Sequence, residues 1–310
     1  MRNDLKIASP QQIGPLQVWP LMWERLASHQ RNLPVGINDL SFEEYEEEDV
    51  GPVINWIQVS NPTQSPIFIP AGLLISEGLL QDRILVAAEY IESESSKTVM
   101  VSCVEKGRWE PSEIYRRTMR APMSVMGAGF DFDSSKGLWV LDTKTRQERV
   151  WQQVESQEAR SGERPTHSLA QIMQEDSETC ELQRNVMKNM KENLKILPQQ
   201  NGILIALNGE PLISEFFSNS QEITRTVKKT ILASSFDMTE VPRNQIVRSD
   251  VERFLDEVLS TKIKTLKDES WGVHLSGGTN NLDTHLTKDS DERLLSMSTL
   301  NRLHPALVGV

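Results

Sequence analysis

The sequence predicts an α+β protein with a β-rich antiparallel N-terminal domain, a helical arm and a smaller α+β C-terminal domain. Three observations support this prediction. Short apolar runs separated by turn residues follow one another between Val53 and Trp109, apolar residues then recur at helical spacing, and both patterns occur after Pro198. We therefore place the domains at residues 1–144, 145–198 and 199–310.

Two features precede the β-rich segment. Leu16 to Trp23 is a short apolar run broken by Pro20, which predicts an edge strand or an entry segment that packs on the first sheet. An acidic cluster follows, and we expect it to be a solvated face rather than a surface for a basic partner. The cluster consists of Glu43, Glu44, Glu46, Glu47, Glu48 and Asp49.

The β-rich segment contains four predicted strands. Val53 to Val59 is rich in β-branched residues and ends at the turn residues Ser60-Asn61-Pro62-Thr63, after which Ile67 to Ile69 starts a second run. A hairpin is the simplest connection between these two. Ile84 to Val86 and Thr98 to Val104 predict the third and fourth strands, with the short spacing of an antiparallel sheet.

Helical periodicity begins at residue 145, with glutamine and glutamate between the apolar positions. The polar stretch Ala159 to Pro165 interrupts it, and the pattern resumes over Ser168 to Leu197. We expect a helical arm that bridges two domains. Met187 and Met190 could form an adaptable binding surface, but methionines at this spacing favour core packing.

The C-terminal region begins with the clearest turn signal in the chain. Ile203 to Leu207, the dipeptide Asn208-Gly209 and the following Pro211 to Ile213 predict a strand, a tight turn and a returning strand.

Two helices and further strands follow this hairpin. Ser220 precedes one helical face, and Ser249 with Glu252 forms a capping-box pattern before another. Beyond Trp271, three short apolar segments separated by polar turns predict strands.

Composition restricts the class of protein. The 310 residues include 33 basic and 44 acidic side chains, a net charge of −11, which argues against a nucleic-acid partner. No secretory signal is evident, and the most apolar stretch, Ile67 to Ile75, is too short for a membrane span. Cys103 and Cys180 show no repeated spacing and are expected to be reduced and separate. We therefore predict a cytoplasmic protein without a membrane partner.

The motifs of metal and cofactor sites are not found. The five histidines include no helical zinc pair, although His274 and His285 could converge from adjacent strands. Gly127-Ala128-Gly129 lacks the third glycine of a dinucleotide fingerprint, and the sequence contains no Gly-x-Ser-x-Gly elbow. We expect no metal and no cofactor.

One cluster of charged residues remains. Gln81-Asp82-Arg83 and Cys103 to Trp109 lie at the ends of predicted strands, followed by Arg116, Arg117 and Arg120. If the strands pair, two guanidinium groups, a carboxylate and an indole meet at one rim, a set suited to an anion and a stacked ring. The alternative is a salt-bridged strand end with an indole over the core. The candidate ligand-binding residues are Gln81, Arg83, Glu105, Arg108 and Trp109.

These residues also carry a resemblance. The chain resembles a prokaryotic family named for its association with ADP-ribosylglycohydrolase and rhodanese-phosphatase proteins. The matching strings are Asn61-Pro62-Thr63, Gly72, Gln81-Asp82-Arg83, Cys103-Val104-Glu105-Lys106-Gly107-Arg108-Trp109 and Gln147-Glu-Arg-Val-Trp151. The resemblance implies, by gene association, a link to ADP-ribose or nucleotide metabolism or to prokaryotic conflict systems, and it implies no established reaction.

Three functions are open at this point. The first is a non-catalytic module that binds a small anionic ligand, such as an ADP-ribose-like nucleotide, at the cluster. The second is a hydrolase of phosphate or glycosidic linkages, with Glu105 as general acid or base and Arg83 and Arg108 stabilising negative charge. The third is a scaffold that self-associates into a homo-oligomer through the helical arm. Cys103 could be a nucleophile, but its β-branched surroundings favour a buried apolar role.

Overall fold

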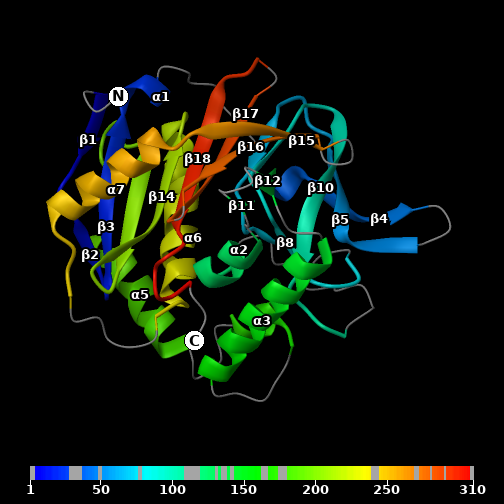
Figure 1. Ribbon diagram of the computed structural model, residues 1–310, viewed down its shortest axis with the longest axis horizontal. Coiled ribbons are helices and arrows are strands. Elements are labelled where there is room, and N and C mark those ends of the chain that lie inside the picture. Colours follow the sequence, from blue (N-terminus) through cyan, green and yellow to red (C-terminus); the bar gives the residue numbers. More distant parts are fainter. Residues whose placement is uncertain are drawn as a thin grey trace.

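Two larger antiparallel sheets with packed helices form the frame of the structure (Figure 1). The computed structural model describes residues 4–27, 37–47, 51–75, 79–107, 119–129, 132–133, 138–139, 143–161, 167–173, 180–238, 244–268, 272–279, 281–289 and 291–307. Helices and antiparallel strands occur together, and the N-terminal region is rich in strands. The predicted α+β class is confirmed.

In the described part of the chain, nine strands form the larger sheet. Its order is β1 (Leu5–Ile7), β3 (Leu16–Trp23), β13 (Gly202–Leu207), β14 (Glu210–Phe217), β18 (Leu294–Asn301), β17 (Leu282–Lys288), β16 (Gly272–Gly278) and β15 (Ile263–Asp268), with β2 (Gln11–Ile13) also paired to β3. Because β3 pairs with β13, strands from the first and the last predicted domain share one sheet. The three domain boundaries themselves stay a prediction.

Helices pack on both faces of this sheet. They are α5 (Cys180–Asn193), α6 (Ser220–Ser235) and α7 (Arg248–Ser260). Side chains alternate along β13, so Ile203 packs in the apolar cluster that includes α5 and α6, whereas Leu204 packs in the cluster with α7. Met190 belongs to the first cluster and Met187 packs against it, which confirms their predicted core role.

The smaller sheet has five strands among the described residues. Its order is β4 (Ser41–Glu47), β5 (Gly51–Asn61), β10 (Ser95–Cys103), β8 (Arg83–Leu85) and β7 (Leu74–Ile75). Two-stranded pairs join β6 (Ile67–Ile69) to β9 (Glu89–Ile91) and β11 (Phe132–Asp133) to β12 (Leu138–Trp139). The short helices α1 (Glu24–Ala27) and η2 (Ile37–Asp39) precede this sheet in the chain. Ile84 faces α2 (Met123–Gly129), α3 (Thr143–Ser161) and α4 (Leu169–Ile172), while Leu85 faces the opposite core.

The hairpin predicted around Ser60 to Thr63 is wrong. β5 pairs with β4 and β10, and β6 pairs instead with β9. The side chain of Asn61 explains the difference, because its amide donates to the carbonyl oxygens of Ser65 and Glu92, both at 2.9 Å. These bonds hold the turn against the chain that leads from β9 into β10.

The edge-strand prediction for Leu16 to Trp23 is also wrong, as is its packing on the first sheet. This segment is β3, which pairs with β1 and β2 on one side and β13 on the other. The carbonyl oxygen of Pro20 accepts from the N–H of Ala8, which follows the end of β1. The backbone nitrogen of Pro20 lies on the same side of β3, so its missing N–H does not interrupt the pairing of β3 with β1.

Local signals in the C-terminal region are mostly confirmed. Asn208 and Gly209 have φ values of 56° and 84° and connect β13 to β14, as a tight Asn-Gly turn requires. The predicted helices and the strands beyond Trp271 are present as α6, α7, β16, β17 and β18. The capping box is wrong, because α7 has Val247 as its N-cap and no side-chain hydrogen bond there.

The apolar stretch Ile67 to Ile75 forms β6 and β7. Among the described residues, no helix combines the length and apolar character needed to cross a membrane.

Candidate functional site

The predicted charged cluster is assembled by the pairing of β8 with β10, which places Cys103 opposite Arg83. Arg83 Nη1 donates to Gln81 Oε1 at 3.3 Å, and Glu105 Oε2 accepts from the N–H of Asp82 at 3.0 Å. Arg83 is 1% exposed and Glu105 is 7% exposed. These side chains therefore bond within a buried network. Arg108, Trp109, Arg116 and Arg117 lie outside the described residues.

Glu44 adds a carboxylate to this network. Its Oε2 lies 3.6 Å from Arg83 Nη2, and its Oε1 accepts from the N–H of Leu80 at 2.6 Å. Alternation along β4 puts Glu44 on the same face as the buried Phe42. The solvated-face prediction is thus wrong for Glu44, whose side chain is 11% exposed, while Glu43, Glu46 and Glu47 are in accessible positions.

Cys103 lies at the centre of this network without access to solvent. Its Sγ is 2.7 Å from the carbonyl oxygen of Glu105 and 3.2 Å from Gln81 Oε1. Burial raises the pKa of the thiol, and the guanidinium of Arg83 only partly opposes this shift. A protonated, buried thiol is a poor nucleophile, which favours the structural role.

Helix α3 docks directly on the network. Gln147 Oε1 accepts from the N–H of Cys103 at 2.8 Å, and Gln147 Nε2 donates to the carbonyl of the same residue at 2.7 Å. One turn further on, the Trp151 ring lies 5.4 Å from Lys106 Nζ. Lys106 Nζ is in turn 3.8 Å from Glu155 Oε1. The end of β10 therefore fixes the position of α3.

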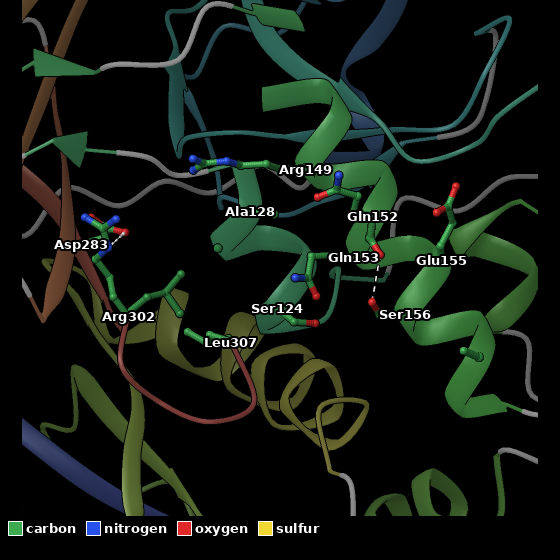
Figure 2. A pocket seen from close by; sticks show the side chains of 13 residues that line it. Ser124, Ala128, Arg149, Gln152, Gln153, Glu155, Ser156, Asp283, Arg302 and Leu307 are labelled. Atoms are coloured by element: carbon green, nitrogen blue, oxygen red, sulfur yellow. Dashed lines mark hydrogen bonds and ion pairs between the residues drawn. The ribbon is translucent and has the colours of Figure 1, made fainter. Parts of the chain in front are cut away.

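The opposite face of α3 lines a cleft of about 770 Å³ (Figure 2). The other walls come from α2 and from the edge of the nine-stranded sheet where β17 begins and β18 ends. The lining residues are Ser124, Gly127 and Ala128 of α2, Arg149, Gln152, Gln153, Glu155, Ser156 and Ala159 of α3, and Asp283, Leu300, Arg302 and Leu307. This volume is in the usual range of small-molecule sites.

The charged residues of the cleft come from α3 and from the sheet. Arg302 Nε lies 3.4 Å from Asp283 Oδ2, and Glu155 is engaged with Lys106. Arg149 is exposed on α3, and in Figure 2 its side chain extends towards the side of the cleft that holds Asp283 and Arg302. The cleft therefore presents guanidinium groups from two separate elements beside amide and hydroxyl groups, a set that can bind a carboxylate or phosphate.

The α2 wall is anchored by a buried carboxylate. Asp237 Oδ2 accepts from the N–H of Met123 at 2.6 Å, and Oδ1 accepts from the N–H of Ser124 at 3.2 Å and from Gln157 Nε2 at 3.1 Å. These bonds tie the first turn of α2 to α3 and to the end of α6. Burial nevertheless raises the pKa of Asp237 to about 6, against the effect of the bonds from Ser124 and Met123.

This pKa predicts a pH-dependent stability. Because the folded protein binds this proton more tightly than the unfolded chain, protonation of Asp237 adds to the free energy of unfolding. This stabilisation is complete below the ordinary pKa of 3.8 and is lost as the pH rises through about 6. From pH 5 to pH 7, the wild type should lose about 1 kcal/mol more unfolding free energy than Asp237→Asn. Urea unfolding at both pH values measures this difference, and equal losses in the two proteins would contradict it.

The wall that contains Arg302 and Leu307 is fixed by His304. Its Nε2 lies 3.0 Å from the carbonyl oxygen of Leu207, and its Nδ1 accepts from the N–H of Ala306 at 3.1 Å. Burial lowers the pKa of this imidazole, so the neutral tautomer holds the turn between Arg302 and Leu307. The two walls of the cleft are thus set by residues outside it.

The structure shows the strands of His274 and His285 but not the position of the His274 side chain. β16 and β17 are adjacent, but His285 pairs with Ser276 in register, and the side chain of His274 lies outside the described residues. Among the side chains that are described, no three histidine, cysteine or acidic groups are arranged to hold a metal ion.

Comparison with known proteins gives one result. The family described as the ARG and Rhodanese-Phosphatase-superfamily-associated Protein domain matches residues 4–300. The chain belongs to this family. Neither the curated proteins nor the solved structures gave a match. The matched residues include the strands of both sheets up to Leu300 and the α2 and α3 walls of the cleft, whereas Arg302 and Leu307 lie just beyond them.

The two sequence strings around Cys103 and Trp151, which carry the resemblance to the family, contact each other in the structure. The first lies at the end of β10 and the second in α3. Sequence reasoning treated the first string as a ligand site and missed the cleft behind the second. A helical projection of α3 could have found Arg149, Gln152 and Gln153, which share one face. No sequence signal points to Arg302, since it comes from the distant end of β18.

Proposed function

We propose that this protein is a non-catalytic binding module for a small anionic ligand, held in the cleft between α2, α3 and the end of β18. The observation that carries this proposal is the cleft itself, with Arg149 and Arg302 reaching it from different elements. Guanidinium groups form paired hydrogen bonds with carboxylate and phosphate oxygens, which a polar cleft of this size can accommodate.

The buried network supports the cleft in this proposal. Gln81, Arg83 and Glu105 bond to neighbouring groups, and they hold the strand end on which α3 docks. A nucleotide-related ligand is favoured because the family is named for association with ADP-ribosylglycohydrolase proteins, which is an associational argument only. A role in a prokaryotic conflict or nucleotide-signalling system, a hydrolase using Glu105 and a self-associating scaffold stay predictions.

A thermal-shift screen tests the proposal. Wild-type protein should gain thermal stability with at least one of ADP-ribose, ADP, the 5′-mononucleotides and ribose 5-phosphate. Arg149→Ala should weaken the binding by about 10- to 100-fold, because a hydrogen bond to a charged group contributes about 1.5–3 kcal/mol.

Arg253→Ala is the matched control, since it removes an arginine that is 79% exposed on α7, away from the cleft. It should leave the ligand-dependent shift unchanged. The proposal is wrong if no ligand in the panel produces a shift, or if both arginine variants respond like the wild type.

A further inference from the structure

The cleft has an apolar floor in addition to its charged rim. The floor residues are Gly127, Ala128, Leu300 and Leu307. Leu300 is 1% exposed, whereas Leu307 and the two α2 residues are partly accessible. The leucine methyl groups and the short side chains of α2 form an apolar surface. This surface offers no hydrogen bonds to the polar groups of a sugar or a phosphate.

Gly127 brings the α2 backbone close to both leucines of the floor. A Cβ at that position would lie 3.7 Å from Leu300 Cδ1 and 3.9 Å from Leu307 Cδ1. The α2 backbone and the leucines are therefore already close, and no side chain stands between them. In the view of Figure 2, Ala128 lies between Arg149 and Leu307, and all three residues line the same cleft.

Polar groups from two elements line the same cleft as the floor. The amides of Gln152 and Gln153 come from α3, and the Arg302–Asp283 pair comes from the sheet. An apolar surface next to hydrogen-bonding groups is complementary to a ring with polar edges. An adjacent guanidinium is complementary to an anion attached to that ring.

We propose that the floor is a base subsite, so that the ligand of this cleft is a nucleotide rather than a sugar phosphate. The base lies against Ala128 and Leu307, and the phosphate contacts Arg149. This inference rests on the proposed function, and it adds the requirement that the ligand carry an aromatic base. Ala128 is a specificity-determining residue because its small side chain leaves the floor open.

Isothermal titration calorimetry of the full chain with the four 5′-mononucleotides and with ribose 5-phosphate tests this inference. The wild type should bind at least one mononucleotide about tenfold more tightly than ribose 5-phosphate, since the base adds buried apolar surface. Ala128→Leu fills the floor and should remove this preference while ribose 5-phosphate binds as before. Arg149→Ala should weaken both kinds of ligand.

Leu307→Ala is a second variant in case Ala128→Leu folds poorly, and it should also lower only the mononucleotide affinity. Equal affinity of the wild type for mononucleotides and ribose 5-phosphate would overturn the base subsite and leave the anion site intact. The same conclusion follows if the floor variants weaken both ligands equally. Failure of every ligand to bind would overturn the proposed function together with this inference.

Discussion

Arg120→Met should lower the free energy of unfolding by about 3–5 kcal/mol, because it leaves a buried carboxylate without its partner. Arg120 Nη1 and Nη2 lie 2.8 Å and 2.7 Å from the two carboxylate oxygens of Glu215. The side chains are 1% and 3% exposed. This is the largest single effect expected for the molecule.

The pair joins the two sheets, which explains the size of the effect. Arg120 bridges to Leu73 beside β7, and its Nε donates to the carbonyl of Ala71 at 2.7 Å. Glu215 is on β14, in the other sheet, and also accepts from Thr230 of α6 at 2.8 Å. Arg120 was placed near the predicted ligand cluster by sequence, but the structure assigns it to this inter-sheet pair.

Urea unfolding gives the measurement. Arg248→Met removes an exposed partner of Glu252 and should cost less than about 1 kcal/mol. Arg120→Met combined with Glu215→Leu should recover part of the loss, because the double variant leaves no uncompensated charge. Similar losses for Arg120→Met and Arg248→Met would show that the buried pair is not the link between the sheets.

Gln147→Ala should lower the free energy of unfolding by about 2–4 kcal/mol, because it leaves a buried N–H and a buried C=O of Cys103 without partners. It should also abolish the ligand-dependent thermal shift, since α3 is no longer fixed against β10. The second effect distinguishes a positioning residue from one that contributes to stability alone.

Gln152→Ala is the matched control on the same helix. Gln152 is exposed and lines the cleft, so its replacement should change stability by less than about 0.5 kcal/mol. Both free energies come from urea unfolding, and the shift comes from the nucleotide screen. If Gln147→Ala is as stable as Gln152→Ala, the docking of α3 does not depend on this amide.

Local sequence patterns predicted the individual strands and helices better than they predicted which strands pair in a sheet. Asn208-Gly209 determines a two-residue turn, so the β13–β14 hairpin follows from the sequence. The pairing of β3 with β13 joins segments about 180 residues apart and depends on packing that no local pattern contains. The β5–β6 hairpin was wrong for the same reason, since β5 finds its partners in β4 and β10.

The candidate site shows the same division. The meeting of Gln81, Arg83 and Glu105 was predictable because two neighbouring strands pair. Their burial was not predictable, since Glu44 arrives from β4 and Gln147 from α3. The cleft was missed because Arg149 and Arg302 come from segments that sequence reasoning assigned to different domains.

The most direct measurement is a crystal structure of the protein with a bound 5′-mononucleotide. We expect the phosphate within hydrogen-bonding distance of the Arg149 guanidinium and the base against Ala128 and Leu307. A nucleotide bound at Arg83 and Glu105, or at any surface away from α2 and α3, would contradict the assignment of this cleft as the ligand site.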